Sequence, residues 1–480
     1  MMWWRTPIHA TWHFTDLCFG VIGGVALARW CPGVTCEWLC IALIAIGFVV
    51  YRPWRACLIV MVIAGCIIGL VRGGVDQYQQ RRYTAFFDQS VCITGSVQDD
   101  PEQQNPSRTT VQLGNITLAG QSIPGVVWVN IVGSVRDIQR GDRVMVTGMM
   151  SAGFGSFAAV LRSGKIKRVE RPQPGDLALQ IRDWFAAGIR RTIDEPAASL
   201  GSGFLLGQKR ALPHDTQEAL RIVGLTHIIV ASGYNLTILV RLARRLFAKV
   251  SRYAAVVSGV ALILGFVAIT GVSPSMVRAG IVSLLSLWAW MYGRSFHPVT
   301  LLGFVGAATV LYAPRYVWGD IGWMLSFASF AGVMIVAPLL QHYFFGDTRP
   351  STVRQVIGET LAAQIVTLPI SVIVFGQMSL IALVANVLIV PFVPLAMALT
   401  FIAGIGGVIS PALSCLGMAA QWLLTAMLWV VEQCAVLPWA SIAITLPWWS
   451  ACAWYGGLII VCWWLQKVTR YQLHQSSVVE

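Results

Sequence analysis

Two charged residues lie in stretches of the chain that are otherwise apolar enough to cross a bilayer. Arg278 follows Pro274 by four residues, and Asp320 opens the apolar run that begins at Ile321. A charged side chain in the middle of a membrane costs roughly 2.5 to 3.5 kcal/mol, so such residues normally face a protein interior or a water-filled path. These residue types therefore indicate polar chemistry within the membrane, with Arg278 suited to attract an anion.

Each of these charges has two interpretations. Pro274 is well placed near the start of a helix, so Arg278 falls about one turn inside it. There it either faces a substrate in the upper part of a pore or extends toward the interface. Asp320 either caps the helix that it precedes or pairs with Arg278.

A further polar group lies within the apolar segment 224–240. Its members are His227, Ser232, Tyr234 and Asn235. Polar groups on several faces predict a segment that is surrounded by protein, or one that is unwound near Ser232 to line a cavity. The alternative is that Ser232 and Asn235 only bridge neighbouring helices. Ser232 and His227 lie about 140° apart on a continuous helix, which disfavours a catalytic pair.

Asn386 lies five residues before Pro391 in another apolar run. We interpret it as packing inside the helix bundle, with direct substrate contact as the alternative.

Composition places the chain in the membrane. Of its 480 residues, 56% are hydrophobic and 11% are charged, whereas about a quarter of a soluble protein is charged. The formal net charge of +13 suits anionic lipid headgroups and would equally suit a polyanionic substrate. We therefore predict a polytopic α-helical membrane protein.

Apolar segments predict about 12 spans. They lie at about 16–30, 38–51, 56–71, 224–240, 253–270, 276–292, 299–312, 321–340, 356–374, 381–404, 413–431 and 448–465. Basic residues beside the first three segments predict a cytoplasmic amino terminus, and alternation then puts the carboxyl terminus in the cytoplasm as well. The segment 224–240 is short and either spans or re-enters.

Residues 81–172 differ from the rest of the chain. Apolar residues alternate with polar ones between Gly, Asp and Pro turns, which predicts about five strands and a small, closed or nearly closed β-barrel outside the cell. Trp128 should project from this sheet, near a basic group formed by Arg162, Lys165, Lys167 and Arg168. Exposed aromatic rings and basic groups are how proteins hold single-stranded nucleic acid. Contact with lipid headgroups is the alternative.

The predicted organisation has five parts. N-terminal transmembrane helices span 1–80, the β-domain 81–172, amphipathic interfacial helices 173–223, a transmembrane domain 224–466 and a cytoplasmic tail 467–480. Cys31 and Cys36 bracket a short loop expected outside the cell, which makes them a disulfide candidate. The seven His residues form no metal-binding pattern, so we expect neither a metal nor a cofactor.

Five blocks of residues, taken in order, resemble the ComEC family, the inner-membrane channel of bacterial natural transformation. The blocks are Leu206-Gly207-Gln208-Lys209-Arg210, Gly224-Leu225-Thr226-His227 through Ser232-Gly233, Ser273-Pro274-Ser275 with Arg278-Ala279-Gly280, Asp320-Ile321-Gly322 with Leu325-Ser326-Phe327, and Asn386 with Pro391. The resemblance implies an OB-like β-domain and transport of one DNA strand into the cytoplasm. We expect the DNA path to involve Lys209, Arg210, Arg221, His227, Ser232, Asn235, Arg278, Asp320 and Asn386.

Two departures from the family pattern matter. Asn235 stands where many members have a His, and the metallo-β-lactamase-like domain that ends many members has no counterpart in the sequence. We therefore expect a channel that is not an enzyme and lacks a nuclease of its own. No nucleotide-binding Gly-Lys-Ser/Thr motif is present. The expected partners are single-stranded DNA, membrane lipid, a separate nuclease, a DNA receptor and a cytoplasmic ATPase or helicase.

Two other functions stay open. One is a transporter of another polyanion or of a lipid-linked sugar. The other is an intramembrane serine protease that uses Ser232 with a His from another span.

Overall fold

The structure is a computed structural model that describes residues 10–31, 37–51, 57–105, 108–132, 138–172, 175–208, 212–229, 232–271, 273–294, 296–346 and 351–470. The chain is mostly helical, at 68%. Within the described residues, eight helices are long and apolar enough to cross a membrane. This agrees with the prediction of a multi-pass membrane protein.

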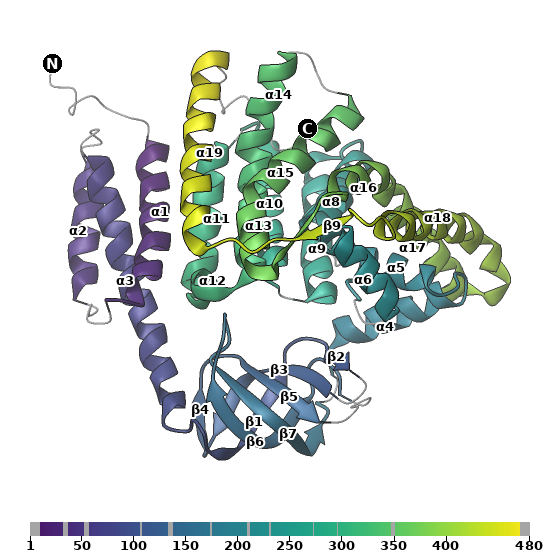
Figure 1. The fold of residues 1–480 in the computed structure, drawn as a ribbon, viewed down its shortest axis with the longest axis horizontal. Helices are drawn as coiled ribbons and strands as arrows, with labels where there is room; N and C mark the ends of the chain where they lie inside the picture. The colour runs from purple at the N-terminus through teal and green to yellow at the C-terminus, as the bar shows by residue number, and fades with distance from the viewer. Residues whose placement is uncertain are drawn as a thin grey trace. The chain divides into compact units, whose positions relative to one another are not determined.

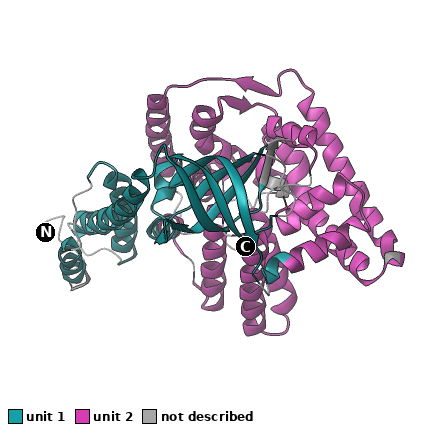
Figure 2. Cartoon of the chain, turned by 90° about the horizontal axis from the view of Figure 1, so that it is seen from below, with its two compact units in different colours: residues 1–179, 303–324 teal, residues 180–302, 325–480 magenta. Residues whose placement is uncertain are grey.

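The chain divides into two compact units (Figure 2). Unit 1 comprises Met1–Leu179 and Gly303–Met324, and unit 2 comprises Gln180–Leu302 and Leu325–Glu480. Helices that lie in or begin in unit 1 are α1 (Ala10–Ala28), α2 (Trp38–Tyr51), α3 (Cys57–Thr84), α12 (Arg315–Gly319) and α13 (Ile321–Ala331). α11 (Pro298–Tyr312) and α4 (Leu177–Arg190) cross from one unit to the other.

Helices α1 and α3 pack with their backbones in close contact. A Cβ atom at Gly24 would lie 2.1 Å from the carbonyl oxygen of Cys66, and one at Gly65 would lie 2.2 Å from that of Leu17. Small residues at a helix interface permit this approach, which drives helix association in lipid. α3 runs on beyond its apolar part to Thr84 and leads directly to the first strand.

Seven strands form the β-domain of unit 1 (Figure 1). They are β1 (Ser90–Val97), β2 (Glu102–Asn105), β3 (Arg108–Leu118), β4 (Gln121–Ile123), β5 (Val127–Val132), β6 (Arg143–Ala152) and β7 (Ala159–Glu170). Pairing runs β1-β6-β7-β5-β3, and β3 also pairs with β1, so the pairing of these five strands returns to its start. All the pairs in this circuit are antiparallel except β5 with β7, which is parallel.

The alternation seen in the sequence accounts for the core of this domain. Val127, Val129 and Ile131 on β5 are at most 2% exposed, whereas Trp128 between them is partly exposed. Such a period of two places successive side chains on opposite faces of a sheet. The phenol of Tyr83, near the end of α3, donates to the carbonyl of Ile123 at 3.2 Å and joins the helix to β4.

The described residues of unit 2 form helices and one short ribbon, β8 (Gln377–Ser379) with β9 (Ser441–Ala443). Its first helices after α4 are α5 (Ala197–Leu206), α6 (His214–Ile222), α7 (Thr226–Ile229), α8 (Gly233–Phe247), α9 (Arg252–Thr270) and α10 (Pro274–Met291). Beyond α13 come the π-helical turn η2 (Gly332–Val336), α14 (Ala337–Phe345), α15 (Thr352–Phe375), α16 (Ala382–Ile389), η3 (Val390–Phe392), α17 (Val393–Ile409), η4 (Pro411–Gly417), α18 (Met418–Ala435) and α19 (Trp448–Thr469).

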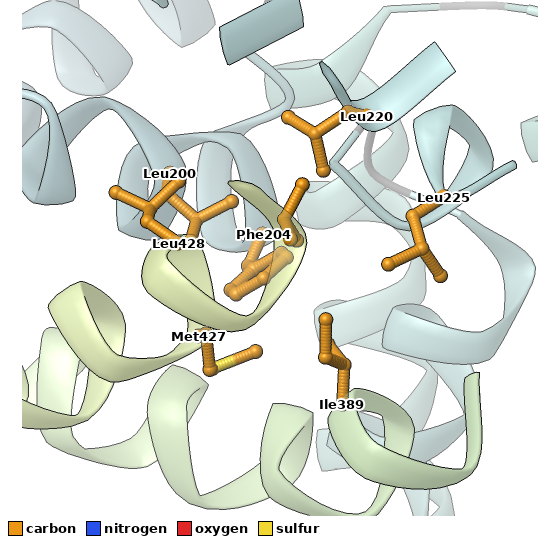
Figure 3. Close-up of a pocket in the computed structure, with 8 residues that line it drawn as sticks. Leu200, Phe204, Leu220, Leu225, Ile389, Met427 and Leu428 are labelled. Carbon is orange, nitrogen blue, oxygen red and sulfur yellow. The ribbon is translucent and has the colours of Figure 1, made fainter. Parts of the chain in front are cut away.

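One core of unit 2 joins α5, α6, α16, α17 and α18. It contains a small pocket whose lining is entirely apolar (Figure 3). The lining side chains are Leu200, Phe204, Leu220, Leu225, Ile389, Met427, Leu428 and Val431. Since this lining offers no polar group, the pocket is unsuited to a phosphate or a sugar, and the candidate site lies elsewhere.

The two helices α4 and α6 of the 173–223 region begin in different ways. Asp176 caps α4 by accepting from the amide of Leu179 at 3.1 Å. Arg182 on α4 is 7% exposed and pairs with Asp183 at 3.1 Å. α6 begins at His214 after Pro213, without a side-chain cap.

Candidate functional site

Arg278 lies just over one turn inside α10, as the Ser-Pro start of that helix predicts. Ser273 caps α10 by accepting from the amide of Met276 at 3.4 Å, and Pro274 occupies the first turn. The Nε of Arg278 donates to the hydroxyl of Ser326 at 2.7 Å, and its guanidinium carbon lies 4.9 Å from the ring centre of Phe330. Ser326 and Phe330 are four residues apart on α13, so one helix face holds the guanidinium by a hydrogen bond and a cation–π contact.

The N-terminus of α8 lies beside this guanidinium. A Cβ atom at Gly233 would lie 3.3 Å from Nη2 of Arg278 and 2.9 Å from Cβ of Ala279. Ser232, the residue before α8, is extended at φ −111° and ψ 167°, and no side chain caps this helix. A helix N-terminus and an arginine both attract negative charge. Their combination makes this place suitable for an anion such as a phosphate.

Ser232, directly before α8, is not helical, which agrees with the predicted unwinding near this residue. α7 ends at Ile229 and α8 begins at Gly233, so Ser232 and His227 do not share one continuous helix. The angular argument against a Ser232–His227 pair therefore does not apply to this structure. The hydroxyl of Ser232 instead contacts the side-chain oxygen of Asn235 at 3.5 Å.

Asn235 is fully buried, and its side-chain amide donates to the carbonyl oxygen of Phe204 at 3.1 Å. Phe204 lies near the end of α5, which terminates at Gly207 in the left-handed conformation at φ 70°. The hydrogen bond thus holds the first turn of α8 against the end of α5. This partner is 31 residues away in the chain, and nothing in the sequence pattern identifies it.

Asp320 and Asn386 both make local hydrogen bonds. The carboxylate of Asp320 accepts from the amide of Trp323 at 2.7 Å, which is the capping geometry that one interpretation predicted. The pKa of Tyr316 is raised to about 12, mainly by burial and also by the negative charge of the nearby Asp320 carboxylate. Tyr316 therefore stays neutral at physiological pH. Asn386 is 5% exposed and donates to the carbonyl of Ala382 at 2.8 Å, one turn earlier on α16.

Three further path residues were predicted on or near α6, and only one of them, Arg221, lies within the described residues. Arg221, on α6, is exposed and pairs with Glu218 at 3.5 Å. Lys209 and Arg210 fall outside the described ranges, and so does Cys36, the predicted disulfide partner of Cys31.

An aromatic cluster covers Trp128 on the outer face of the β-domain. The ring centre of Trp128 lies 4.8 Å from that of Phe157 and 5.7 Å from that of Phe154, with interplanar angles of 60° and 66°. The indole nitrogen donates to the side chain of Asn130 at 3.0 Å. Phe154 is 54% exposed, so the cluster offers an aromatic surface to solvent. Phe154 and Phe157 come from the β6–β7 hairpin, where two Phe among small residues were a signal that the sequence reasoning missed.

The basic residues of β7 are exposed, as a polyanion-binding strand requires. Arg162, Lys165 and Arg168 pair in register with Met149, Thr147 and Met145 on β6. Lys167 is also exposed, and Arg168 contacts Glu170 at 2.9 Å. Across the described residues of both units, no group of three or more His, Cys, Asp or Glu side chains could hold a metal ion.

Comparison with known proteins assigns the chain to a family. A model of the competence protein family matches residues 204–468. The chain belongs to the competence protein family. Membership implies involvement in DNA uptake during competence, in a family of membrane channels that is not a known enzyme family. The matched range includes α8, α10 and α13, which form the Arg278 site, whereas the β-domain precedes it. No curated protein and no solved structure matches the chain.

Proposed function

We propose that this competence protein is a channel that conducts single-stranded DNA across the bacterial cytoplasmic membrane. The observation that carries the proposal is the Arg278 guanidinium, held by Ser326 and Phe330 beside the uncapped start of α8. A fixed positive charge at this point attracts each passing phosphate. One charge attracts a phosphate only over a short distance, so a strand can leave as well as enter.

The β-domain at 81–172 receives the strand outside the cell. Its circuit of five strands has the connectivity expected of a closed, OB-like barrel, with β5 parallel to β7. Bases stack on Trp128, Phe154 and Phe157, while the basic residues of β7 attract the phosphates. In the proposed topology, 1–80 and 224–466 form the membrane part, with about twelve spans and both termini in the cytoplasm.

The other path residues have supporting parts in this proposal. Ser232 and Asn235 shape the start of α8, Asp320 caps α13, and Asn386 donates to a carbonyl within α16. Lys209, Arg210 and Arg221 guide phosphates before they reach Arg278. A separate nuclease supplies the single strand, a DNA receptor delivers it, and a cytoplasmic ATPase or helicase pulls it.

Influx into vesicles tests the proposal. The purified full-length chain is placed in lipid vesicles that contain a single-strand-binding protein as a trap, and a labelled oligonucleotide is added outside. We expect nuclease-protected label to accumulate for the single strand and not for the duplex. A chain that is correctly inserted and admits neither form, or both equally, would contradict the proposal. Entry of a lipid-linked sugar instead would favour the alternative transporter.

A further inference from the structure

The short helix α12 contacts the two segments that carry the aromatic cluster, the β6–β7 hairpin and the turn before β5. A Cβ atom at Gly319, its last residue, would lie 2.8 Å from the backbone Cα of Gly155 in the β6–β7 hairpin. Gly155 lies in that hairpin between Phe154 and Phe157, directly after Phe154, and has a φ of +57°. The contact is therefore between two backbones, and a side chain at either position would push them apart.

The second contact is made by Arg315, the first residue of α12. A Cβ atom at Gly125 would lie 2.8 Å from Nη1 and 3.0 Å from Nη2 of Arg315, so the guanidinium fills the space against this turn. The turn leads into β5 and hence to Trp128. It is also tied to the hairpin, because the amide of Ala158 donates to the carbonyl of Val126 at 2.8 Å.

Helix α12 is itself anchored on the helices of unit 1. The Nε of Arg315 contacts the carboxylate of Asp76 on α3 at 3.1 Å, and both side chains are about one-tenth exposed. Gln80, one turn further along α3, donates to the same carboxylate. Trp318 donates its indole N–H to the carbonyl of Val25 on α1 at 2.9 Å. α12 thus contacts two helices, α1 and α3, as well as the hairpin and the turn.

We propose that α12 positions the aromatic cluster, and that Gly319 and Arg315 are positioning residues for the capture of a single strand. Gly319 sets the place of the hairpin that bears Phe154 and Phe157, and Arg315 sets the place of the turn that leads to Trp128. The inference rests on the proposed function, since it assumes that bases stack on this cluster. It goes beyond that function by assigning the spacing of the three rings to a helix outside the β-domain.

The test compares two Gly→Ala variants of the full-length chain in lipid nanodiscs. In Gly319→Ala the new methyl group must displace the hairpin, whereas in Gly23→Ala it enters open space on α1. Binding is followed by the anisotropy of a labelled single-stranded oligonucleotide and of an abasic strand of equal length. Because stacking of one base contributes enough to change affinity about tenfold, we expect Gly319→Ala to weaken binding of the normal strand by about that factor. Gly23→Ala should bind both strands as the wild type does.

The abasic strand and the salt dependence separate positioning from general damage. Gly319→Ala should bind the abasic strand as tightly as the wild type. Its slope of log K against log salt should not change either, since that slope counts phosphate contacts and not stacking. Arg315→Lys, which keeps the charge for Asp76 but lacks the planar group packed on Gly125, should give the same pattern with a smaller loss.

Trp128→Ala distinguishes the two levels of the proposal. If Trp128→Ala weakens binding of the normal strand and both α12 variants bind it as the wild type does, the cluster captures DNA but α12 does not position it. If Trp128→Ala itself has wild-type affinity, the cluster is not the strand-binding surface and the proposed function loses its barrel step. Equal losses for normal and abasic strands in Gly319→Ala would also overturn the positioning role.

Discussion

Replacing Arg278 gives a graded series because three substitutions remove different parts of one interaction. Arg278→Lys keeps the positive charge but loses the Nε hydrogen bond to Ser326 and the planar contact with Phe330. Arg278→Gln removes the charge and keeps a polar side chain. Arg278→Glu reverses the charge, so the site repels each phosphate instead of attracting it.

The size of each effect follows from simple electrostatics. A phosphate roughly 5 Å from a unit positive charge, at an effective dielectric constant of about 20, is attracted by about 3 kcal/mol. Its loss in Arg278→Gln should slow strand entry about a hundredfold, and its reversal in Arg278→Glu should slow entry by roughly another hundredfold. A cation–π contact contributes about 0.5–1 kcal/mol, so Arg278→Lys should lose only a few-fold.

Initial influx rates of a single-stranded oligonucleotide into vesicles measure this series, at equal amounts of inserted protein. Arg294→Gln and Arg294→Glu are the matched controls, because Arg294 is exposed and lies just beyond α10. We expect both controls to conduct as the wild type does. Equal rates for Arg278→Gln and Arg278→Glu, or wild-type rates for both, would refute the electrostatic reasoning and remove Arg278 from the path.

Three further predictions concern residues around the two sites. Asn235→Ala leaves the buried carbonyl of Phe204 without its donor and should destabilise the chain by about 1–3 kcal/mol, measured by thermal unfolding in detergent; an unchanged melting temperature would contradict this. Replacing three of the four exposed basic residues of β7, in the variant Arg162→Gln with Lys165→Gln and Arg168→Gln, should reduce the salt slope of single-strand binding by about 2 while stacking of the nucleobases persists. Asp76→Ala leaves the buried guanidinium of Arg315 without its carboxylate and should lower the free energy of unfolding by about 3–5 kcal/mol. Combining Asp76→Ala with Arg315→Met should recover part of that stability. If it recovers none, the lost ion pair is not the cause of the destabilisation.

The amino-acid sequence determined the class of this protein and the local form of its elements. Low charge and long apolar runs predicted a multi-pass membrane protein, because a membrane selects for composition over about twenty residues. Pro274 predicted the start of α10 and hence the position of Arg278 about one turn inside it, since proline favours the first turn of a helix. Alternation predicted a β-domain of about five strands, whereas the structure has seven because the short strands β2 and β4 also pair with β3. The ordered blocks predicted membership of the competence protein family, which the match over residues 204–468 confirms.

Only the tertiary structure decided which groups meet. Ser326 is 48 residues from Arg278, and no periodic pattern connects them. Ser232 has an extended backbone directly before α8, so a helical wheel drawn through it misplaces His227. The contact of Gly319 with Gly155 joins parts of the chain separated by several elements. A short stretch of sequence determines where a helix is capped and which residues alternate along a strand. Partners that are distant in the sequence depend on how whole helices and strands pack, and one short segment does not encode that packing.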